Sequence, residues 1–230
     1  MSSCVILTIG LCYGGNNKLN GTINDSLLIE KMFSGPNFVM KLRSGKKPVT
    51  KANIIEAVKA WLAYDPQKPH IFHFAGHGRQ SPIQKKKKRE LLVYENVETE
   101  NDNKDEVLYD EHFDVLVDND FASLFKEFKA PLVFIMDNCH SDRFVEVCPE
   151  NKVISIAACK ESDTAPEIYV TNLFGQDQVH GVLTDTLTKV MANHAKDGKV
   201  DLVEVLKKEH AMCHVRISPS TDEFIINITT

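Results

Sequence analysis

A series of short apolar runs constrains the fold of this chain more than any other feature. They are separated by segments in which apolar residues recur with the spacing of a helix. Val, Ile, Leu and Phe are concentrated in these runs, and turn residues bound them. Apolar runs of this length without polar alternation are typical of strands buried on both faces of a sheet. They span residues 5–11, 38–42, 70–75, 131–136, 153–157 and 224–228.

Helical patterns lie between these runs. The candidate N-caps are Asn24 or Asp25, Thr50, Asp120 and Asp201, and another apolar helix face is formed by Leu183, Leu187, Val190 and Met191. Small polar residues are favoured at the N-cap because their side chains accept hydrogen bonds from otherwise unsatisfied backbone N–H groups. Strands that alternate with helices predict a mostly parallel sheet with helices on both faces.

Length and composition exclude several classes of protein. The 230 residues suit one domain, and 43% are hydrophobic, which is enough for a core. The net charge of −5 offers no overall basic field for nucleic acid. Run 5–11 is too short to span a membrane, so we expect a soluble, cytoplasmic protein. The six cysteines are irregularly spaced, which indicates reduced thiols rather than disulfides.

Two of the expected strands end in residues that carry chemistry. Run 70–75 is followed by Gly76-His77-Gly78, and run 131–136 by Asp137-Asn138-Cys139. Sites in open α/β sheets form at the carboxyl ends of the strands. A thiol attacks as a thiolate, and histidine is the natural base near neutral pH. The pattern predicts Cys139 as nucleophile and His77 as general base, with the backbone N–H groups of Gly78 and Cys139 stabilising the oxyanion.

Other interpretations of these residues remain open. A cysteine at a strand end can be a small buried apolar residue, and Gly-His-Gly can be a plain turn. A zinc-dependent hydrolase is a further alternative. Its candidate ligands lack compact spacing, and two of them, three residues apart on one strand, point to opposite faces. These candidates are His70, His73, His77, Cys139 and His140.

Phe74-Ala75-Gly76-His77-Gly78 and Asp137-Asn138-Cys139-His140-Ser141 resemble the two catalytic signatures of metacaspases, which belong to the caspase-like cysteine peptidases. Their order and separation also resemble that family. The likeness continues at residues 23–25, 156–159, 163–165 and 180–184, and so covers nearly the whole chain.

The resemblance implies a caspase-like three-layer α/β/α sandwich with a mostly parallel six-stranded central sheet. A single peptidase domain would span residues 1–230, with about 1–145 similar to a large subunit, about 150–230 similar to a small one, and a charged loop over 79–119. Such a chain would be a bare catalytic domain without a prodomain. It would also be a monomer, as is usual in the family.

The resemblance also implies hydrolysis of peptide bonds after Arg or Lys, with protein or peptide substrates as partners. Asp137 and Asp25 would line the pocket for the basic side chain, because paired carboxylates select a cation. A plain helix N-cap is the open alternative for Asp25. We expect no organic cofactor, no nucleic acid and no membrane partner.

Metacaspases often need calcium, and the acidic part of the 79–119 stretch offers oxygen ligands. By the resemblance, calcium ligands would be Asp110, Asp118, Asn119 and Glu146. A solvated acidic loop is the alternative. The basic run is a candidate self-processing site or, alternatively, a solvated patch. It comprises Lys85, Lys86, Lys87, Lys88 and Arg89.

Three positions depart from the family pattern. Ala75 stands where Ser is frequent, Asp142 where Gly is usual, and Thr22 where related chains can have Cys. Because Ala75 and Asp142 change the polarity beside the expected site, a second function stays open. In that alternative the chain is a caspase-like scaffold that binds partners and cuts little.

Overall fold

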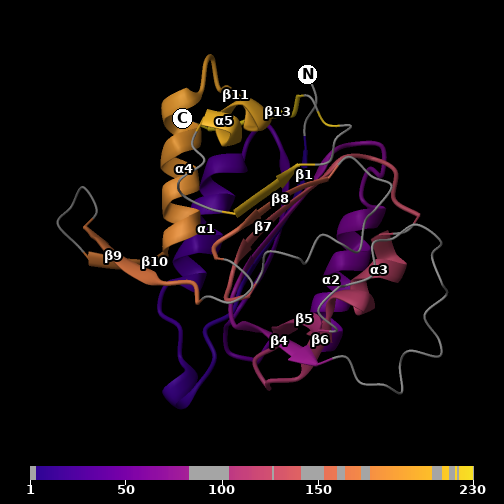
Figure 1. Ribbon diagram of the computed structural model, residues 1–230, viewed down its shortest axis with the longest axis vertical. Coiled ribbons are helices and arrows are strands. Elements are labelled where there is room, and N and C mark those ends of the chain that lie inside the picture. Colours follow the sequence, from indigo (N-terminus) through magenta and orange to yellow (C-terminus); the bar gives the residue numbers. More distant parts are fainter. Residues whose placement is uncertain are drawn as a thin grey trace.

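The computed structural model describes residues 4–82, 104–125, 127–140, 153–159, 164–171, 177–208, 214–217, 221 and 223–229. A six-stranded sheet lies at its centre (Figure 1), in the order β12-β8-β7-β3-β1-β2. All neighbouring pairs are parallel except β12 with β8. The strands are β1 (Val5–Gly10), β2 (Phe38–Arg43), β3 (His70–Ala75), β7 (Leu132–Asp137), β8 (Val153–Ala157) and β12 (His214–Ile217).

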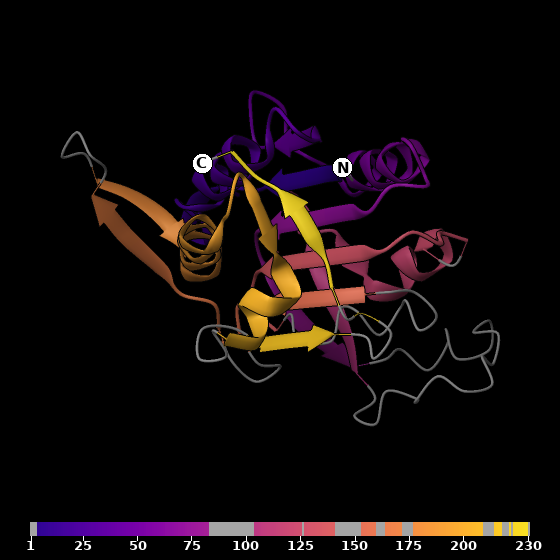
Figure 2. The same cartoon turned by 90° about the horizontal axis from the view of Figure 1, so that it is seen from above.

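Helices cover both faces of this sheet, as Figure 2 shows from above. Helices α1 (Thr22–Phe33), α4 (Val182–His194) and α5 (Leu202–Lys208) contribute to one apolar core. Helices α2 (Lys51–Ala63) and α3 (Asp118–Phe125) contribute to the other. The three-layer arrangement expected from the alternating pattern is therefore present.

Because side chains alternate between the two faces of a strand, the inner strands contribute residues to both cores. Leu7, Phe72 and Phe134 face α2 and α3, whereas residues one position earlier or later face α1 and α4. Every residue of β1, β3 and β7 is buried. Burial of both faces explains why these strands appear in the sequence as continuous apolar runs.

Three smaller sheets surround the central one. Strands β4 (Gly78–Pro82), β5 (Lys104–Tyr109) and β6 (Val115–Val117) form an antiparallel sheet. Strands β9 (Glu167–Thr171) and β10 (Asp177–Gly181) form an antiparallel pair that projects beside α4 (Figure 1). A further pair joins β11 (Lys199–Asp201) to β13 (Ile225–Asn227), and a 3-10 turn, η1, spans Gly15–Asn17.

The charged stretch 79–119 was expected to be one long loop, and this was wrong for its described parts. Those parts contain β4 to β6 and the start of α3. Val107 and Leu116 are buried within this sheet, so short apolar segments between charges suffice to anchor it.

The run at 224–228 does form a strand, but not in the central sheet. It pairs antiparallel with β11, and the sixth central strand is β12. Strand β12 lies at the sheet edge and contains His214 and Arg216. Because an edge strand need not be apolar throughout, it did not stand out in the sequence.

Two of the expected N-caps are confirmed. The Thr50 side chain accepts a hydrogen bond from the Asn53 N–H at 3.3 Å, and the Asn53 side chain accepts one from the Thr50 N–H at 3.1 Å. Asp201 Oδ1 accepts from the Val203 N–H at 3.0 Å at the start of α5.

The other two N-cap assignments were wrong. Helix α1 begins at Thr22 with Gly21 as N-cap, so Asn24 and Asp25 lie inside its first turn. Asp120 lies inside α3, where its carboxylate accepts from the Val117 N–H at 3.2 Å. In both cases the helix starts upstream of the residue that the sequence pattern assigned as its N-cap.

None of the helices in the described part of the chain is long and apolar enough to cross a membrane.

Trp61 offers a test of the core on the α2 face. Its ring is fully buried, and its indole N–H donates to the Val5 carbonyl at 3.0 Å. Trp61→Phe should lower the free energy of unfolding by about 1–3 kcal/mol, through the lost hydrogen bond and reduced packing. Unfolding in urea should be followed by circular dichroism rather than by tryptophan fluorescence, because Trp61 is the chain's single tryptophan. Tyr64→Phe, at an exposed ring, is the control; equal stability of both variants would contradict the packing described.

Candidate active site

The pairing of β3 with β7 aligns the two chemically distinctive strand ends. Ala75 lies opposite Asp137 in this parallel pair, and the Gly76 N–H donates to the Asp137 carbonyl at 3.5 Å. His77 and Cys139 each follow two residues beyond this aligned pair. Their backbones therefore emerge at the same edge of the sheet, as the sequence predicted.

Gly78 packs directly against the backbone that carries the cysteine. An ideal Cβ on Gly78 would lie 2.2 Å from Asn138 Nδ2 and 2.7 Å from the Cys139 carbonyl oxygen. No side chain fits at these distances, so glycine is required for the approach. The chain segment bearing His77 is thus in contact with the segment bearing Cys139.

The hydrogen bond of His77 with a backbone carbonyl defines its tautomer. His77 Nε2 lies 2.7 Å from the carbonyl oxygen of Asn17, at the end of η1. A carbonyl oxygen only accepts, so Nε2 carries the hydrogen. In the neutral ring, Nδ1 is then the free base. This arrangement suits a residue that must take a proton from a thiol.

Tyr13 holds the backbone of the histidine in place. Its hydroxyl accepts from the His77 N–H at 2.8 Å and donates to the Tyr109 carbonyl at 2.8 Å. The ring centroids of Tyr13 and His77 lie 4.5 Å apart. Burial raises the pKa of Tyr13, so the hydroxyl keeps its proton. Tyr13 did not stand out in the sequence, because only the fold brings residues 13, 77 and 109 together.

Cys139 is half-buried at the end of β7. Its Sγ accepts a hydrogen bond from the Ala165 N–H at 3.3 Å. A backbone donor aimed at the sulfur suits a sulfur that acquires negative charge. The next residue, His140, has a φ of 56°, a left-handed conformation that marks a tight turn directly after the cysteine.

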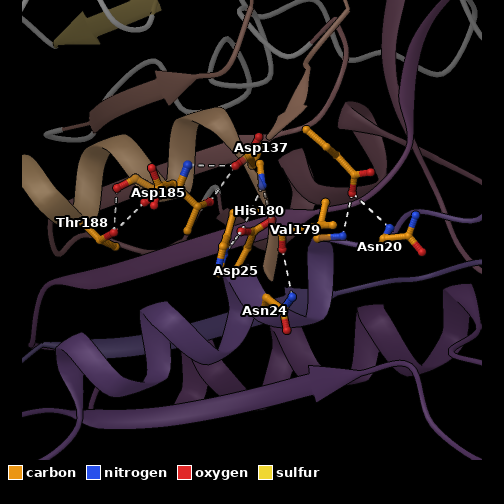
Figure 3. Close-up of polar contacts among 12 residues, drawn as sticks. Asn20, Asn24, Asp25, Asp137, Val179, His180, Asp185 and Thr188 are labelled. Atoms are coloured by element: carbon orange, nitrogen blue, oxygen red, sulfur yellow. Dashed lines mark hydrogen bonds and ion pairs between the residues drawn. The ribbon is translucent and has the colours of Figure 1, made fainter. Parts of the chain in front are cut away.

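Asp25 and Asp137 are buried beside this edge, 1% and 7% exposed. Asp25 Oδ1 lies 3.0 Å from His180 Nδ1, and both Asp25 oxygens accept from the Gly181 N–H, at 3.1 and 3.0 Å. Asp137 Oδ2 accepts from the Thr184 N–H at 2.9 Å and from the Thr184 hydroxyl at 2.7 Å. Figure 3 shows Asp25, Asp137 and His180 converging from α1, β7 and β10.

Gly181 lies against both carboxylates. Its N–H donates to Asp25, and an ideal Cβ on Gly181 would lie 2.2 Å from Asp137 Oδ2 and 2.7 Å from Oδ1. Among the described residues, each hydrogen bond to the Asp137 carboxylate ends on Oδ2, so Oδ1 keeps its capacity to accept.

The pKa of each acid is raised, mainly by burial. Burial, followed by the charge of Asp25, raises the pKa of Asp137 to about 7, although hydrogen bonds from Thr184 oppose the shift. Burial likewise raises the pKa of Asp25, against its hydrogen bonds with His180 and Gly181. A cation placed between two such carboxylates would relieve their repulsion and restore their ionised forms.

Glu167 contributes a third carboxylate. Its Oε1 accepts from the Asn20 N–H at 3.1 Å and the Gly21 N–H at 2.7 Å, which ties β9 to the start of α1. After burial and the other causes, its negative charge also raises the pKa of Asp25 and Asp137. Glu167 was missed in the sequence, because it lies far from Asp25 along the chain and belongs to no catalytic motif.

Two of the histidines of the zinc alternative are engaged elsewhere. His70 lies with its ring nitrogens 2.8 Å from the carbonyls of Lys68 and Trp61. His73 contacts Thr8 and Thr184 on the other face of the sheet. Over the residues that the structure describes, no group of three or more His, Cys, Asp or Glu side chains is arranged to hold a metal ion.

Asp110 has a structural role that fits poorly with calcium binding. It is fully buried; Oδ1 accepts from the N–H groups of His112 and Asp114 at 2.9 and 2.8 Å, and Oδ2 from the Lys51 N–H at 2.6 Å. Three backbone donors occupy a carboxylate that would otherwise face the ion. Asp118 and Asn119 begin α3, but their side chains lie outside what the structure describes, as do Glu146, Asp142 and the run 85–89.

A solved structure of similar fold supports this architecture. No curated protein matches the chain. Among solved structures, it is similar to protein GSU0716 from Geobacter sulfurreducens, with 16% identity over 99% of this chain and 95% of that chain, and a TM-score of 0.60. The Drosophila initiator caspase Dronc is 12% identical over 98% of this chain and 79% of that one, with a TM-score of 0.47.

A family model carries more weight than these distant structural likenesses. The model of the caspase domain matches residues 2–214, which include both strand ends described above and the acids beside them. The chain therefore belongs to the caspase domain family of cysteine peptidases.

Proposed function

We propose that this protein is a cysteine endopeptidase of metacaspase type, cleaving peptide bonds after Arg or Lys. The observation that carries the proposal is the buried pair Asp25 and Asp137, two carboxylates against one glycine at the sheet edge that bears Cys139. Burying two acids together is costly unless positive charge compensates them, and a cationic substrate side chain would supply such charge.

The catalytic steps follow from the donors and acceptors around the thiol. His77 Nδ1 takes the proton of Cys139 while the Asn17 carbonyl holds Nε2–H in place. The sulfur attacks the substrate carbonyl, and the backbone N–H groups of Gly78 and Cys139 stabilise the oxyanion. His77 then protonates the leaving amine, and water, activated by the same imidazole, releases the acyl group.

Charge complementarity accounts for the proposed specificity. Asp137 is two residues before the nucleophile, so a side chain bound beside it belongs to the residue whose carbonyl is attacked. A guanidinium can bind carboxylates through two parallel hydrogen bonds, and an ammonium can bind as a point charge. An acidic substrate side chain would meet three carboxylates, counting Glu167, and would be rejected.

Cys139→Ala tests the nucleophile. The wild-type protein should hydrolyse fluorogenic peptides with Arg or Lys before the reporter, and Cys139→Ala should lower kcat/KM by at least about 10³-fold because no other group can form the acyl-enzyme. Cys12→Ala, at another half-buried cysteine, is the matched control and should retain activity. Wild-type protein that neither cleaves such peptides nor reacts with thiol-directed arginyl inhibitors would instead support the scaffold function.

The raised pKa of Asp137 predicts a pH dependence specific to basic substrates. Below about pH 7 the carboxyl is increasingly protonated, so kcat/KM for an Arg peptide should rise as pH increases through 7. A norleucine peptide lacks the positive charge, so its KM should not change with the ionisation of Asp137. Any rise in its kcat/KM over this pH range should come from kcat alone.

Asp137→Asn should remove that difference and lower kcat/KM for the Arg peptide about 100-fold. Asp185→Asn is the matched control, because Asp185 is a buried acid that pairs with Lys189 instead. Parallel pH profiles for the Arg and norleucine peptides in the wild-type protein would contradict the acidic pocket.

Calcium activation and self-processing enter the proposal from the family resemblance. Activity measured in a calcium titration after chelation should rise with calcium, with Asp118, Asn119 and Glu146 as the proposed ligands and not Asp110. Wild-type protein incubated with calcium should then be cleaved within the run 85–89, whereas Cys139→Ala should stay intact. Identical intact bands in both proteins would end the processing hypothesis.

A further inference from the structure

A group of aromatic side chains lies beside the His77 ring. The centroid of this ring is 4.5 Å from that of Tyr13 and 6.1 Å from that of Phe113. The Phe113 ring also lies 5.3 Å from that of Tyr13 and 5.7 Å from that of Tyr109. These separations are typical of interacting aromatic rings. We call Tyr13, Tyr109 and Phe113 the aromatic group; none of them belongs to the catalytic signatures.

Phe113 is the member of the aromatic group with the most exposed ring. Tyr13 is 6% exposed, whereas Phe113 is 39% exposed. A single apolar side chain at the surface is common in itself. The position of Phe113 is what distinguishes it, because its ring lies beside His77 and also faces water. The ring can therefore contact a molecule that is bound at His77.

The backbone at Phe113 is strained. Strands β5 and β6 are joined by a tight loop, which the Asp110 N–H closes by donating to the Asp114 carbonyl at 3.1 Å. The third of the three residues between them is Phe113, with a φ of 63°. Glycine is preferred at this position of such loops, because other side chains are strained at positive φ. The chain thus keeps a bulky ring where the fold alone favours glycine.

The loop that carries Phe113 is anchored on both sides of its tip. The Phe113 N–H donates to the Asp110 carbonyl at 3.0 Å, and the Asp110 carboxylate is fully buried with the three backbone donors described above. The Glu111 carboxylate accepts from the Ser44 hydroxyl and from the Val49 N–H, both at 2.6 Å. These bonds hold the ring in position before any substrate binds, which lowers the entropic cost of binding.

The aromatic group and the acid pair lie on opposite faces of the central sheet. Asp137 bonds to Thr184 of α4, on the face that α1 and α4 cover. Tyr13 belongs to the core on the other face, which α2 and α3 cover. A substrate with its basic side chain at Asp137 and its carbonyl at Cys139 would therefore continue across the sheet edge toward the aromatic group.

The proton that His77 supplies sets the same direction. In the proposed mechanism His77 protonates the nitrogen of the cleaved bond, so the residue that carries this nitrogen begins within reach of the imidazole. Phe113 lies beside that imidazole, on the side away from the acid pair. Its exposed ring is thus placed along the path of the residue that follows the cleaved bond.

We propose that Phe113 forms one wall of a subsite for the residue that follows the cleaved bond, and that this subsite favours an aromatic or apolar side chain. An aromatic substrate side chain can pack against the Phe113 ring, whereas glycine offers no side chain for this contact. The inference rests on the proposed function and adds a second determinant of substrate specificity to it.

Internally quenched peptides that differ only in the residue after a single arginine test this subsite. The parameter kcat/KM covers the steps up to release of the leaving amine, so it reports the contacts of that residue. In wild-type protein, kcat/KM should be at least about 5-fold higher with phenylalanine than with glycine after the arginine. Phe113→Gly should bring this ratio close to one. Glycine accommodates the φ of residue 113, so the variant should keep the loop.

The ratio separates a subsite from a purely structural role of Phe113. If Phe113 only supported His77, Phe113→Gly would lower kcat/KM equally for both peptides and leave their ratio unchanged, which would overturn the inference. Tyr64→Ala is the matched control, because it removes another exposed ring, one that stacks on Phe38, and should keep the wild-type ratio. An equal fall of the ratio in Tyr64→Ala would also overturn the inference.

An arginyl chloromethyl ketone distinguishes a failure of this inference from a failure of the proposed function. The reagent has no residue beyond its reactive group, so its reaction with Cys139 does not use the subsite. Wild-type protein that reacts with it but cleaves both peptides at equal kcat/KM would contradict the subsite alone. Protein that neither reacts with it nor cleaves either peptide would contradict the proposed function, and the subsite with it.

Discussion

The in-register parallel pairing of β3 with β7 is the constraint on which the rest of the site depends. Because Ala75 lies opposite Asp137, the two chains leave the sheet level with each other and carry His77 and Cys139 to one edge. A slip by one residue would turn the end residues to the wrong faces. The burial of both strands on both sides makes such a slip costly, so packing of the core also fixes where His77 and Cys139 leave the sheet.

The same edge concentrates negative charge. Asp25 and Asp137 approach each other through Gly181, and Glu167 lies close enough to affect both. Proteins retain buried charges at a cost to stability, and such groups cluster at functional sites. The backbone N–H groups of Gly181 and Thr184 hold the carboxylates in place without adding a full positive charge, which the proposed cationic substrate side chain would supply.

The sequence sufficed for features that depend on local pattern. Continuous apolar runs predicted the buried strands, and the residues after two of them predicted that His77 and Cys139 emerge at one edge of the sheet. The pocket role of Asp25 and Asp137 came from the family resemblance alone. Features that depend on tertiary contacts could not be predicted from the sequence. Strand β12 is polar because it lies at an edge, and Tyr13 and Glu167 act through partners far away in the chain. Asp25 resembled a helix cap, whereas its carboxylate bonds across to Gly181.

Chemical modification with an arginyl chloromethyl ketone tests the central claim most directly, because one reagent requires the nucleophile, the base and the acidic pocket together. Peptide mapping by mass spectrometry should find a single adduct, on Cys139, whose formation slows strongly in His77→Ala and with an alanyl reagent in place of the arginyl one. Equal labelling of Cys12 and Cys139, or equal rates with both reagents, would contradict the account.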